Sequence, residues 1–187
     1  NDYRGQRGDE DKASRTAVYD EQPAAGSLPQ ARLYDKTHHD DRAAALRGHL
    51  RIAGMGDTTA RHFRDKLAMR MVAKENGIPV PEFIHILNHK KINEFADTVP
   101  YPYMIKPRLL AGSYGLKKVH NKQEMWDRIN WLADEQSFFL MERFVPGSIY
   151  HVDTIINGKE VVFGLASKYG TPPFEVAHQG RVFTSQT

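Results

Sequence analysis

The sequence contains no cysteine among its 187 residues. This absence excludes a disulfide framework, a thiol nucleophile and thiolate metal ligands. No apolar run approaches the roughly 18 residues that a membrane-spanning helix requires, and the N-terminal region lacks the layout of a signal peptide. We therefore expect a cytoplasmic protein with no membrane partner.

The sequence also has little net charge and none of the common phosphate-binding motifs. The 26 basic and 23 acidic residues leave a formal charge of +3 at pH 7, although the pI is about 9.1. Acidic residues are mixed among the lysines, which disfavours a nucleic-acid partner and leaves a basic nucleic-acid binder as the weakest alternative. Neither G-x-x-x-x-G-K-[ST] nor G-x-G-x-x-G occurs, so a Walker A loop, a Rossmann loop and a kinase loop are excluded.

The most informative stretch runs from residue 103 to residue 119. It begins as an apolar strand that carries Lys106, continues as a loop with Gly112, Ser113 and Gly115, and ends as a short strand at Val119. Small loop residues allow backbone N–H groups to approach an anion closely, and a nearby lysine adds positive charge. Two interpretations stay open at this point: a site for nucleotide phosphates and an ordinary hairpin.

The patterning of the remaining chain predicts an α+β fold with antiparallel pairing. The strongest hairpin signal is Asn157-Gly158 between two apolar, β-rich runs. Residues 1–40 are expected to form a loop-rich remnant of an N-terminal region. Helices are expected at 40–51, from Asp57 or Thr58 to about Asn76, at 88–99 and at 121–132. Strands are expected at 83–87, 103–106, 138–143, 149–156 and 160–166, with a further short strand that ends at Val119.

Five motifs that follow one another in the sequence resemble those of the ATP-grasp superfamily, and within it the biotin carboxylase-like and carboxylate–amine ligase-like members. The resemblance covers about residues 41–187. It implies two lobes with antiparallel sheets that enclose a nucleotide, with 41–143 forming the first lobe and the start of the linker, and 144–187 an incomplete second lobe. The motifs are Arg64-Asp-Lys66, Gly77-Ile-Pro-Val-Pro81, Ile105-Lys-Pro107 with Gly112-Ser-Tyr-Gly115, Met141-Glu-Arg-Phe-Val-Pro-Gly147 and His151-Val-Asp153.

The resemblance implies a role for each matching position. Lys66 resembles the first nucleotide-contacting lysine, and Lys106 resembles the strand lysine that reaches the phosphates. Gly112, Ser113 and Gly115 resemble the mobile loop that closes over the β- and γ-phosphates. The remaining implied positions are the linker that reads the adenine edge and a polar group near the ribose: Glu142, Phe144 and Val145 in the linker, and Asp153.

The sequence departs from the family pattern at two places. Ile149 stands where many members carry a glutamate that holds the ribose hydroxyls. The acidic and Glu-x-Asn-type magnesium ligands of the family do not appear within the chain, so we expect them beyond Thr187 and expect no turnover from this stretch by itself.

The function implied by the resemblance is ATP-dependent ligation that forms a C–N or C–C bond. ATP would activate a small carboxylate as an acyl phosphate for attack by an amine or a similar nucleophile, with Mg²⁺ as cofactor. The resemblance is compatible with a homodimer and assigns no catalytic residue. A non-catalytic nucleotide-binding module, acting as a regulator or scaffold, is the alternative.

Overall fold

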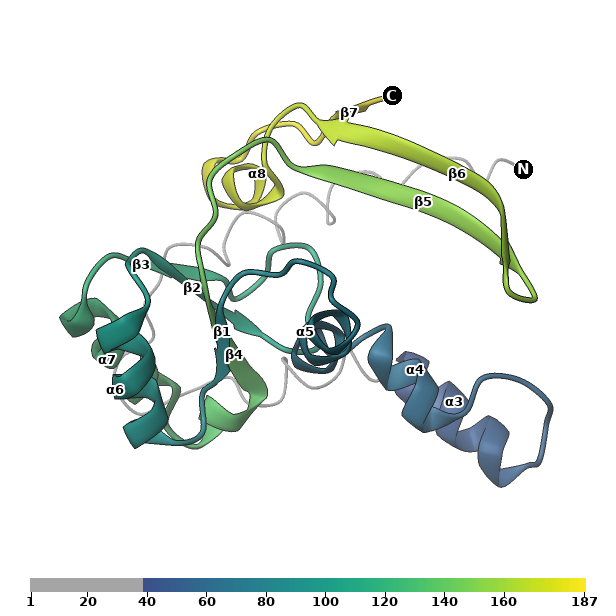
Figure 1. Ribbon diagram of the computed structural model, residues 1–187, viewed down its shortest axis with the longest axis horizontal. Helices are drawn as coiled ribbons and strands as arrows, with labels where there is room; N and C mark the ends of the chain where they lie inside the picture. The colour runs from purple at the N-terminus through teal and green to yellow at the C-terminus, as the bar shows by residue number, and fades with distance from the viewer. Residues whose placement is uncertain (1–38) are drawn as a thin grey trace, which may run out of the picture. The chain divides into compact units, whose positions relative to one another are not determined.

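The computed structural model describes residues 39–187 of the chain, and their side chains from Ala43 onward. Apart from its last two residues, the expected loop-rich region 1–40 lies outside the described part. Figure 1 shows the elements in chain order. They are α3 (His39–His49), α4 (Asp57–His62), α5 (Lys66–Glu75), β1 (Phe83–His85), α6 (His89–Thr98), β2 (Tyr103–Pro107), β3 (Lys117–Val119), α7 (Lys122–Leu132), a 3₁₀ helix η1 (Ala133–Phe138), β4 (Phe139–Arg143), β5 (Tyr150–Asn157), β6 (Glu160–Tyr169), α8 (Pro173–Gln179) and β7 (Ser185–Gln186).

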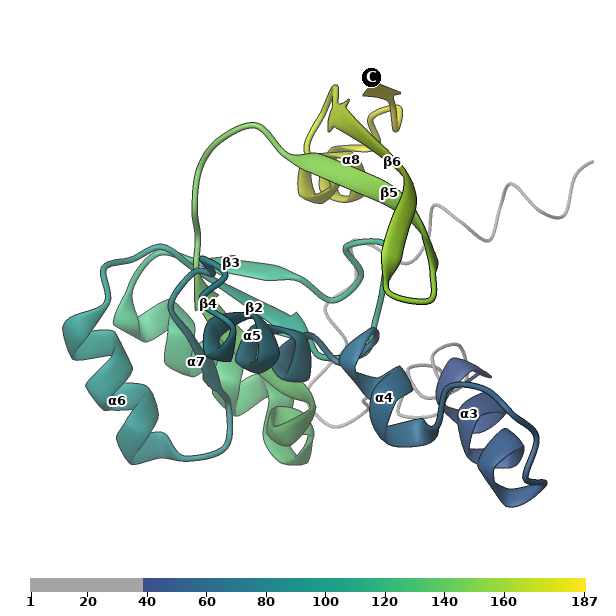
Figure 2. The same cartoon turned by 45° about the vertical axis from the view of Figure 1, so that its right-hand side comes forward.

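The first sheet has four antiparallel strands in the order β1-β4-β2-β3. Helices α6 and α7 lie side by side against one of its faces, as both Figure 1 and Figure 2 show. The core forms between this face and the two helices, because each helix places one apolar stripe against alternate strand residues. Its buried members are Ile86, Ile92, Tyr103, Ile105, Val119, Met125, Ile129, Leu132, Phe139 and Met141.

The alternation of side chains along β2 and β4 decides what lies on the opposite face of this sheet. Tyr103 and Ile105 belong to the core under α6 and α7, so Lys106, the next residue along β2, is directed to the other face. On β4, Met141 is in the core and Glu142 therefore shares the face of Lys106. In the antiparallel register, Lys106 lies opposite Leu140, which makes Lys106 and Glu142 diagonal neighbours.

The helix predicted from Asp57 or Thr58 to Asn76 is wrong as a single element. The structure divides it into α4 and α5, and the side chain of Asp65 caps α5 by accepting a hydrogen bond from the Leu67 amide at 3.0 Å. Aspartate is a strong N-cap residue because its carboxylate satisfies amide donors that a helix start leaves unpaired. Helix α4 begins after Gly56 without a side-chain cap, so neither Asp57 nor Thr58 caps it.

The other sequence-based expectations for the elements are confirmed, with boundaries shifted by a few residues. Asn88 accepts from the Lys91 amide at 3.1 Å and caps α6, and Asn121 accepts from the Glu124 amide at 2.9 Å and caps α7. Strands β5 and β6 form the expected hairpin around Asn157-Gly158. The α+β fold class with antiparallel sheets is therefore confirmed, whereas the lobe boundaries stay a prediction.

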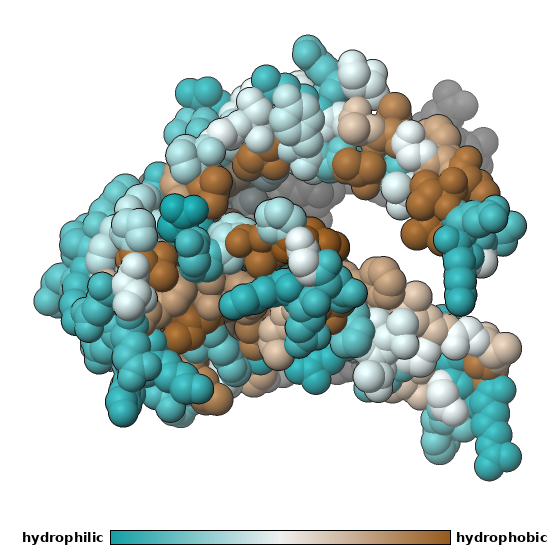
Figure 3. All heavy atoms as spheres, viewed as in Figure 1, coloured by the Kyte–Doolittle hydropathy of each residue, from teal (hydrophilic) through white to brown (hydrophobic). Residues whose placement is uncertain are grey.

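The second sheet has the order β5-β6-β7 and exposes much of its apolar surface. Figure 3 shows apolar side chains gathered over β5 and β6. The exposed apolar side chains of the hairpin are Tyr150, Val152, Ile155, Ile156, Val161, Val162, Phe163 and Leu165.

Within residues 39–187, no helix is both long enough and apolar enough to cross a bilayer.

Candidate functional site

A buried carboxylate joins two cations on the face of the first sheet that is turned away from α6 and α7. The Glu142 side chain is 8% exposed and pairs with the ammonium group of Lys106. Its second oxygen accepts from Nε of Arg70, on α5, at 3.0 Å. Because charges in a partly dry site interact more strongly than in water, this pairing fixes both cations to the sheet.

Lys66, the first residue of α5, contributes a third cation that forms no ion pair with a carboxylate in the described part of the chain. Its Nζ donates to the carbonyl oxygen of Leu110 and, at 3.5 Å, to that of Arg108. Since Lys66 and Arg70 are four residues apart on one helix, they share a helix face. Sequence analysis missed Arg70, although this i, i+4 spacing from Lys66 was the available signal.

The pKa values of the two lysines reflect their burial and the charges of neighbouring side chains. Burial, with the nearby charges of Lys106, Arg64 and Arg70, lowers the pKa of Lys66 to about 8, and Asp65 opposes this shift. Burial also lowers the pKa of Lys106, while Glu142 counteracts the effect. An anion placed between the two ammonium groups would relieve this repulsion.

A second buried carboxylate, Asp65, lies immediately before Lys66 in the chain. Its side chain is 2% exposed, and both of its oxygens accept hydrogen bonds from the Arg108 guanidinium, one of them at 3.1 Å. Burial alone would raise the pKa of Asp65, but its bonds with Arg108, Leu67 and Arg61 hold it below the ordinary value. The sequence showed Asp65 and Arg108 beside predicted site lysines, but not that they meet.

The loop that follows β2 has a left-handed backbone at three positions. Gly112, Ser113 and Gly115 have φ values of 68°, 60° and 71°. At Gly115, a Cβ atom would also come within 2.9 Å of the Pro107 ring, so only glycine fits there without displacement. Ser113 adopts this conformation despite its side chain, which costs about 1–2 kcal/mol for an L-residue.

The predicted adenine-reading linker follows directly from β4. The Phe144 amide donates to the Pro102 carbonyl at 2.9 Å, so this donor is already used within the protein. The Phe144 ring lies under the Lys118 ammonium group at 3.7 Å, which links the linker to β3. Val145 is 54% exposed, and its amide remains the one predicted to donate to the base.

Asp153 lies on β5, within the second sheet. Its carboxylate pairs with Nδ1 of His151 at 3.0 Å, and the His151 ring stacks at 4.8 Å on that of Tyr169. The structure thus brings Lys106 and Glu142 together on the first sheet, and it bonds Lys66, on α5, to the start of the loop that carries Gly112. Asp153 lies in a separate polar pair on the second sheet.

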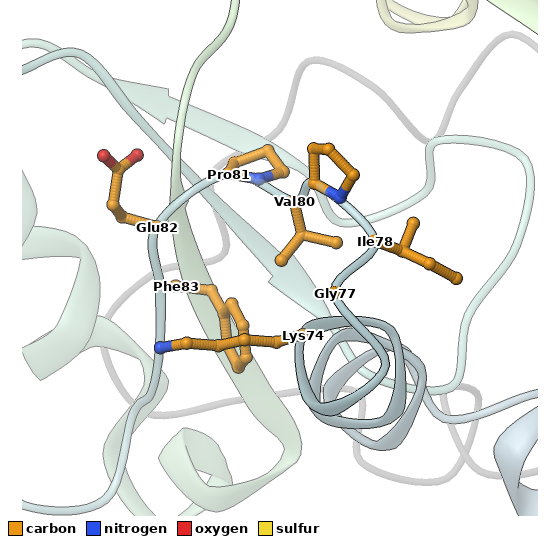
Figure 4. Close-up of a pocket in the computed structure, with 8 residues that line it drawn as sticks. Lys74, Gly77, Ile78, Val80, Pro81, Glu82 and Phe83 are labelled. Atoms are coloured by element: carbon orange, nitrogen blue, oxygen red, sulfur yellow. The ribbon is translucent and has the colours of Figure 1, made fainter.

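The described residues also contain an open hollow that holds none of the predicted site residues. It measures about 340 Å³ and is formed by the segment 77–83 beside Lys74 at the end of α5 (Figure 4). Arg143 holds Glu82 at 2.8 Å, and the Lys74 ammonium lies 5.9 Å from the centre of the Phe83 ring. One continuous segment, 77–83, thus provides almost all of the lining of this hollow.

A metal ion needs several donor side chains that converge on one point. Within residues 39–187, no three His, Asp or Glu side chains come together in a way that could hold a metal ion. These residues alone therefore do not fit a magnesium site.

Comparison with known proteins finds one matching family and curated relatives that are named as amino-acid ligases. Residues 72–171, more than half of the chain, match the family described as the D-ala D-ala ligase C-terminus. The L-arginine-specific L-amino acid ligase of Bacillus subtilis is 29% identical over 68% of the chain and 32% of its own length. The D-alanine–D-alanine ligase of Thermosipho africanus is 27% identical over 49% of the chain and 26% of its own length.

A solved structure supports the same fold. The ATP complex of D-alanine–D-alanine ligase from Bacillus anthracis superposes with a TM-score of 0.52 at 20% identity, over 73% of this chain and 43% of that one. The chain spans about a third or less of the length of the curated relatives described above. The chain belongs to the D-ala D-ala ligase C-terminal family, within the ATP-grasp superfamily.

Proposed function

We propose that the chain forms the ATP-binding part of a ligase that activates a carboxylate as an acyl phosphate. The observation that carries this proposal is the excess of positive charge around Glu142. Arg70 and Lys106 both pair with this one carboxylate. Lys66 adds a third cation, close enough to Lys106 and Arg70 for their charges to lower its pKa. A triphosphate supplies the negative charge that such a cluster lacks, and preorganised cations stabilise a transferring phosphoryl group.

The loop with Gly112, Ser113 and Gly115 adds a second kind of phosphate contact. Its left-handed residues turn the backbone so that successive N–H groups can point to one side, an arrangement that binds anions. Lys66 bonds to the carbonyl groups at the start of this loop, so movement of the loop and release of the Lys66 ammonium would be linked. In this proposal, the Val145 amide and the carbonyl of Glu142 read the adenine, and Asp153 lies near the ribose.

The proposed reaction has two steps. A carboxylate oxygen of the acid attacks the γ-phosphorus of ATP, and ADP leaves with the electron pair of the broken P–O bond. The amine then attacks the acyl phosphate, phosphate leaves, and an amide bond remains once the nitrogen has lost a proton. Because the relatives are named as ligases of L-amino acids or D-alanine, amino acids are the proposed acid and nucleophile, and Mg²⁺ the proposed cofactor.

Calorimetric titration with ATP in the presence of Mg²⁺ tests this proposal. We expect saturable binding, and we expect Lys106→Ala to remove most of the affinity. Lys122→Ala is the matched control, because Lys122 forms only an exposed pair with Asp97. Absence of ATP binding by the wild-type chain would overturn the proposal.

A second measurement distinguishes the ligase from the alternative function, which is nucleotide binding without turnover. Release of ADP and phosphate is followed while D- and L-amino acids are offered singly and in pairs. Release that depends on an amino acid supports the ligase. ATP binding without any amino-acid-dependent release by the full-length protein supports the regulatory or scaffold module.

A further inference from the structure

Asp65 and Arg108 are both adjacent, in the chain, to the proposed phosphate-binding groups. Asp65 immediately precedes Lys66, and Arg108 follows Lys106 by two residues, at the point where β2 leads into the glycine loop. The contact between them therefore joins the start of α5, which carries Lys66, to the segment that follows Lys106. We propose that Asp65 and Arg108 form a positioning pair that holds Lys66 and the start of the glycine loop in place relative to Lys106, an inference that rests on the function proposed above.

The geometry of the pair is that of a rigid clamp. Both oxygens of Asp65 accept from the Arg108 guanidinium, through Nε at 3.1 Å and through Nη2. A bidentate pair of this type restricts both the distance and the relative orientation of its partners, which a lysine cannot do. The side chains are 2% and 16% exposed, so water competes little for these bonds.

Each partner is also anchored to the backbone of its own surroundings. Asp65 caps α5 through the Leu67 amide, and the Lys66 amide donates to the Arg108 carbonyl at 2.9 Å. Arg108 in turn donates from Nη1 to the Ser137 carbonyl at 3.1 Å, at the end of η1. The pair therefore joins the start of α5, the end of β2 and the segment that leads into β4.

The Lys66 ammonium depends on this arrangement. Its acceptors are the carbonyl groups of Arg108 and Leu110. Both belong to the segment that the Arg108 side chain holds in place through its bonds to Asp65 and Ser137. If this segment shifted, Lys66 would lose its acceptors and could turn toward solvent. Displacements of about 1 Å in a binding group are enough to reduce function by roughly 100-fold.

The conservative variant Arg108→Lys tests the pair, because it keeps the positive charge and removes the bidentate geometry. We expect ATP to bind about ten-fold or more weakly, because the displaced Lys66 would lose a hydrogen bond to a phosphate. A hydrogen bond between charged groups contributes about ten-fold or more to affinity. Arg128→Lys is the matched control: Arg128 is a half-buried arginine on α7 that stacks on Trp131 at 4.0 Å. This control should bind ATP like the wild type.

A second measurement separates positioning from a purely structural role. The titration of the Lys66 side chain is followed by NMR of lysines labelled with ¹³C at Cε, assigned with Lys66→Arg. The groups that face Lys66 are Lys106, Arg64, Arg70 and Asp65. In the wild type the pKa should be about 8, and in Arg108→Lys it should rise toward its ordinary value as the ammonium turns into water.

Failure of the positioning role can be distinguished from failure of the proposed function. If the wild type binds no ATP, the proposed function fails, while the Lys66 titration still tests the clamp. If Arg108→Lys lowers the melting temperature but leaves the Lys66 titration and the ATP affinity as in the wild type, the pair is structural only and the inference is refuted. Should Arg108→Lys not fold, Asp65→Glu replaces it, with the same expected loss of affinity and the same change in titration.

Discussion

Replacing Glu142 by glutamine tests the charge balance on which the candidate site depends. The substitution keeps the size of the side chain, removes its charge and replaces one of its two accepting oxygens by an NH2 group that can only donate. Lys106 and Arg70, whose side chains are 13% and 28% exposed, would then face each other without a counter-charge. Breaking a buried ion pair by removing one partner costs about 3–5 kcal/mol, and the partial exposure of Arg70 favours the lower end of this range.

The expected loss of about 3 kcal/mol is large enough to measure by urea or thermal unfolding. For a chain of this size each kcal/mol corresponds to roughly 2–4 °C, so the melting temperature should fall by roughly 6–12 °C. Glu82→Gln is the matched control, because Glu82 pairs with Arg143 at 2.8 Å but both side chains are largely exposed. An exposed pair contributes about 1 kcal/mol or less.

The same variant should respond more strongly to polyanions than the wild type does. Pyrophosphate would supply the negative charge that the variant lacks, and binding to the folded state raises the melting temperature. A larger stabilisation of Glu142→Gln than of the wild type at equal pyrophosphate concentration is therefore expected. If Glu142→Gln is no more destabilising than Glu82→Gln, the carboxylate does not balance the cations, and the reasoning fails.

Three further predictions concern the loop, the pH dependence and the hairpin. Gly115→Ala should lower the free energy of unfolding in urea more than Gly112→Ala does. Both variants place an alanine in a left-handed conformation, at a cost of about 1–2 kcal/mol, but only the Cβ atom at position 115 would meet the Pro107 ring, at 2.9 Å. Equal losses in the two variants would contradict this. ATP affinity should weaken as pH rises above about 8, where Lys66 loses its proton, and Lys66→Arg should bind with less pH dependence in calorimetry; an unchanged slope would exclude Lys66 as the titrating group. Ile155→Lys on the exposed hairpin should change the unfolding free energy by less than about 0.5 kcal/mol and reduce light scattering at high concentration, whereas a large destabilisation would show that this side chain is packed.

Most secondary structure could be predicted because it depends on signals that are local in the chain. Asn88 and Asn121 cap helices through their own side chains, and the apolar spacing of Met125, Ile129 and Leu132 identifies the buried side of α7. The break before α5 was missed because Asp65 lies inside a pattern that is helical on both sides. Its capping role is stabilised by Arg108, 43 residues away in the sequence, which no local window contains.

The candidate site was predicted only in part. The resemblance singled out Lys66, Lys106 and Glu142 separately, and it assigned Glu142 by its backbone. The structure adds that the Glu142 side chain holds Lys106 and Arg70. Alternation along β2 and β4 places these side chains on one face, but their contact also requires the strand register.

By itself, the sequence determined most of the order of helices and strands and the hairpin at Asn157-Gly158, because these depend on spacing and residue type along the chain, and its motifs carried the resemblance to the ATP-grasp superfamily. Only the tertiary structure decided which charges meet. Asp65 with Arg108, and Glu142 with Lys106 and Arg70, are brought together by strand register and helix packing. Electrostatic interactions depend on distance and burial in space, and neither quantity can be read from positions in a sequence.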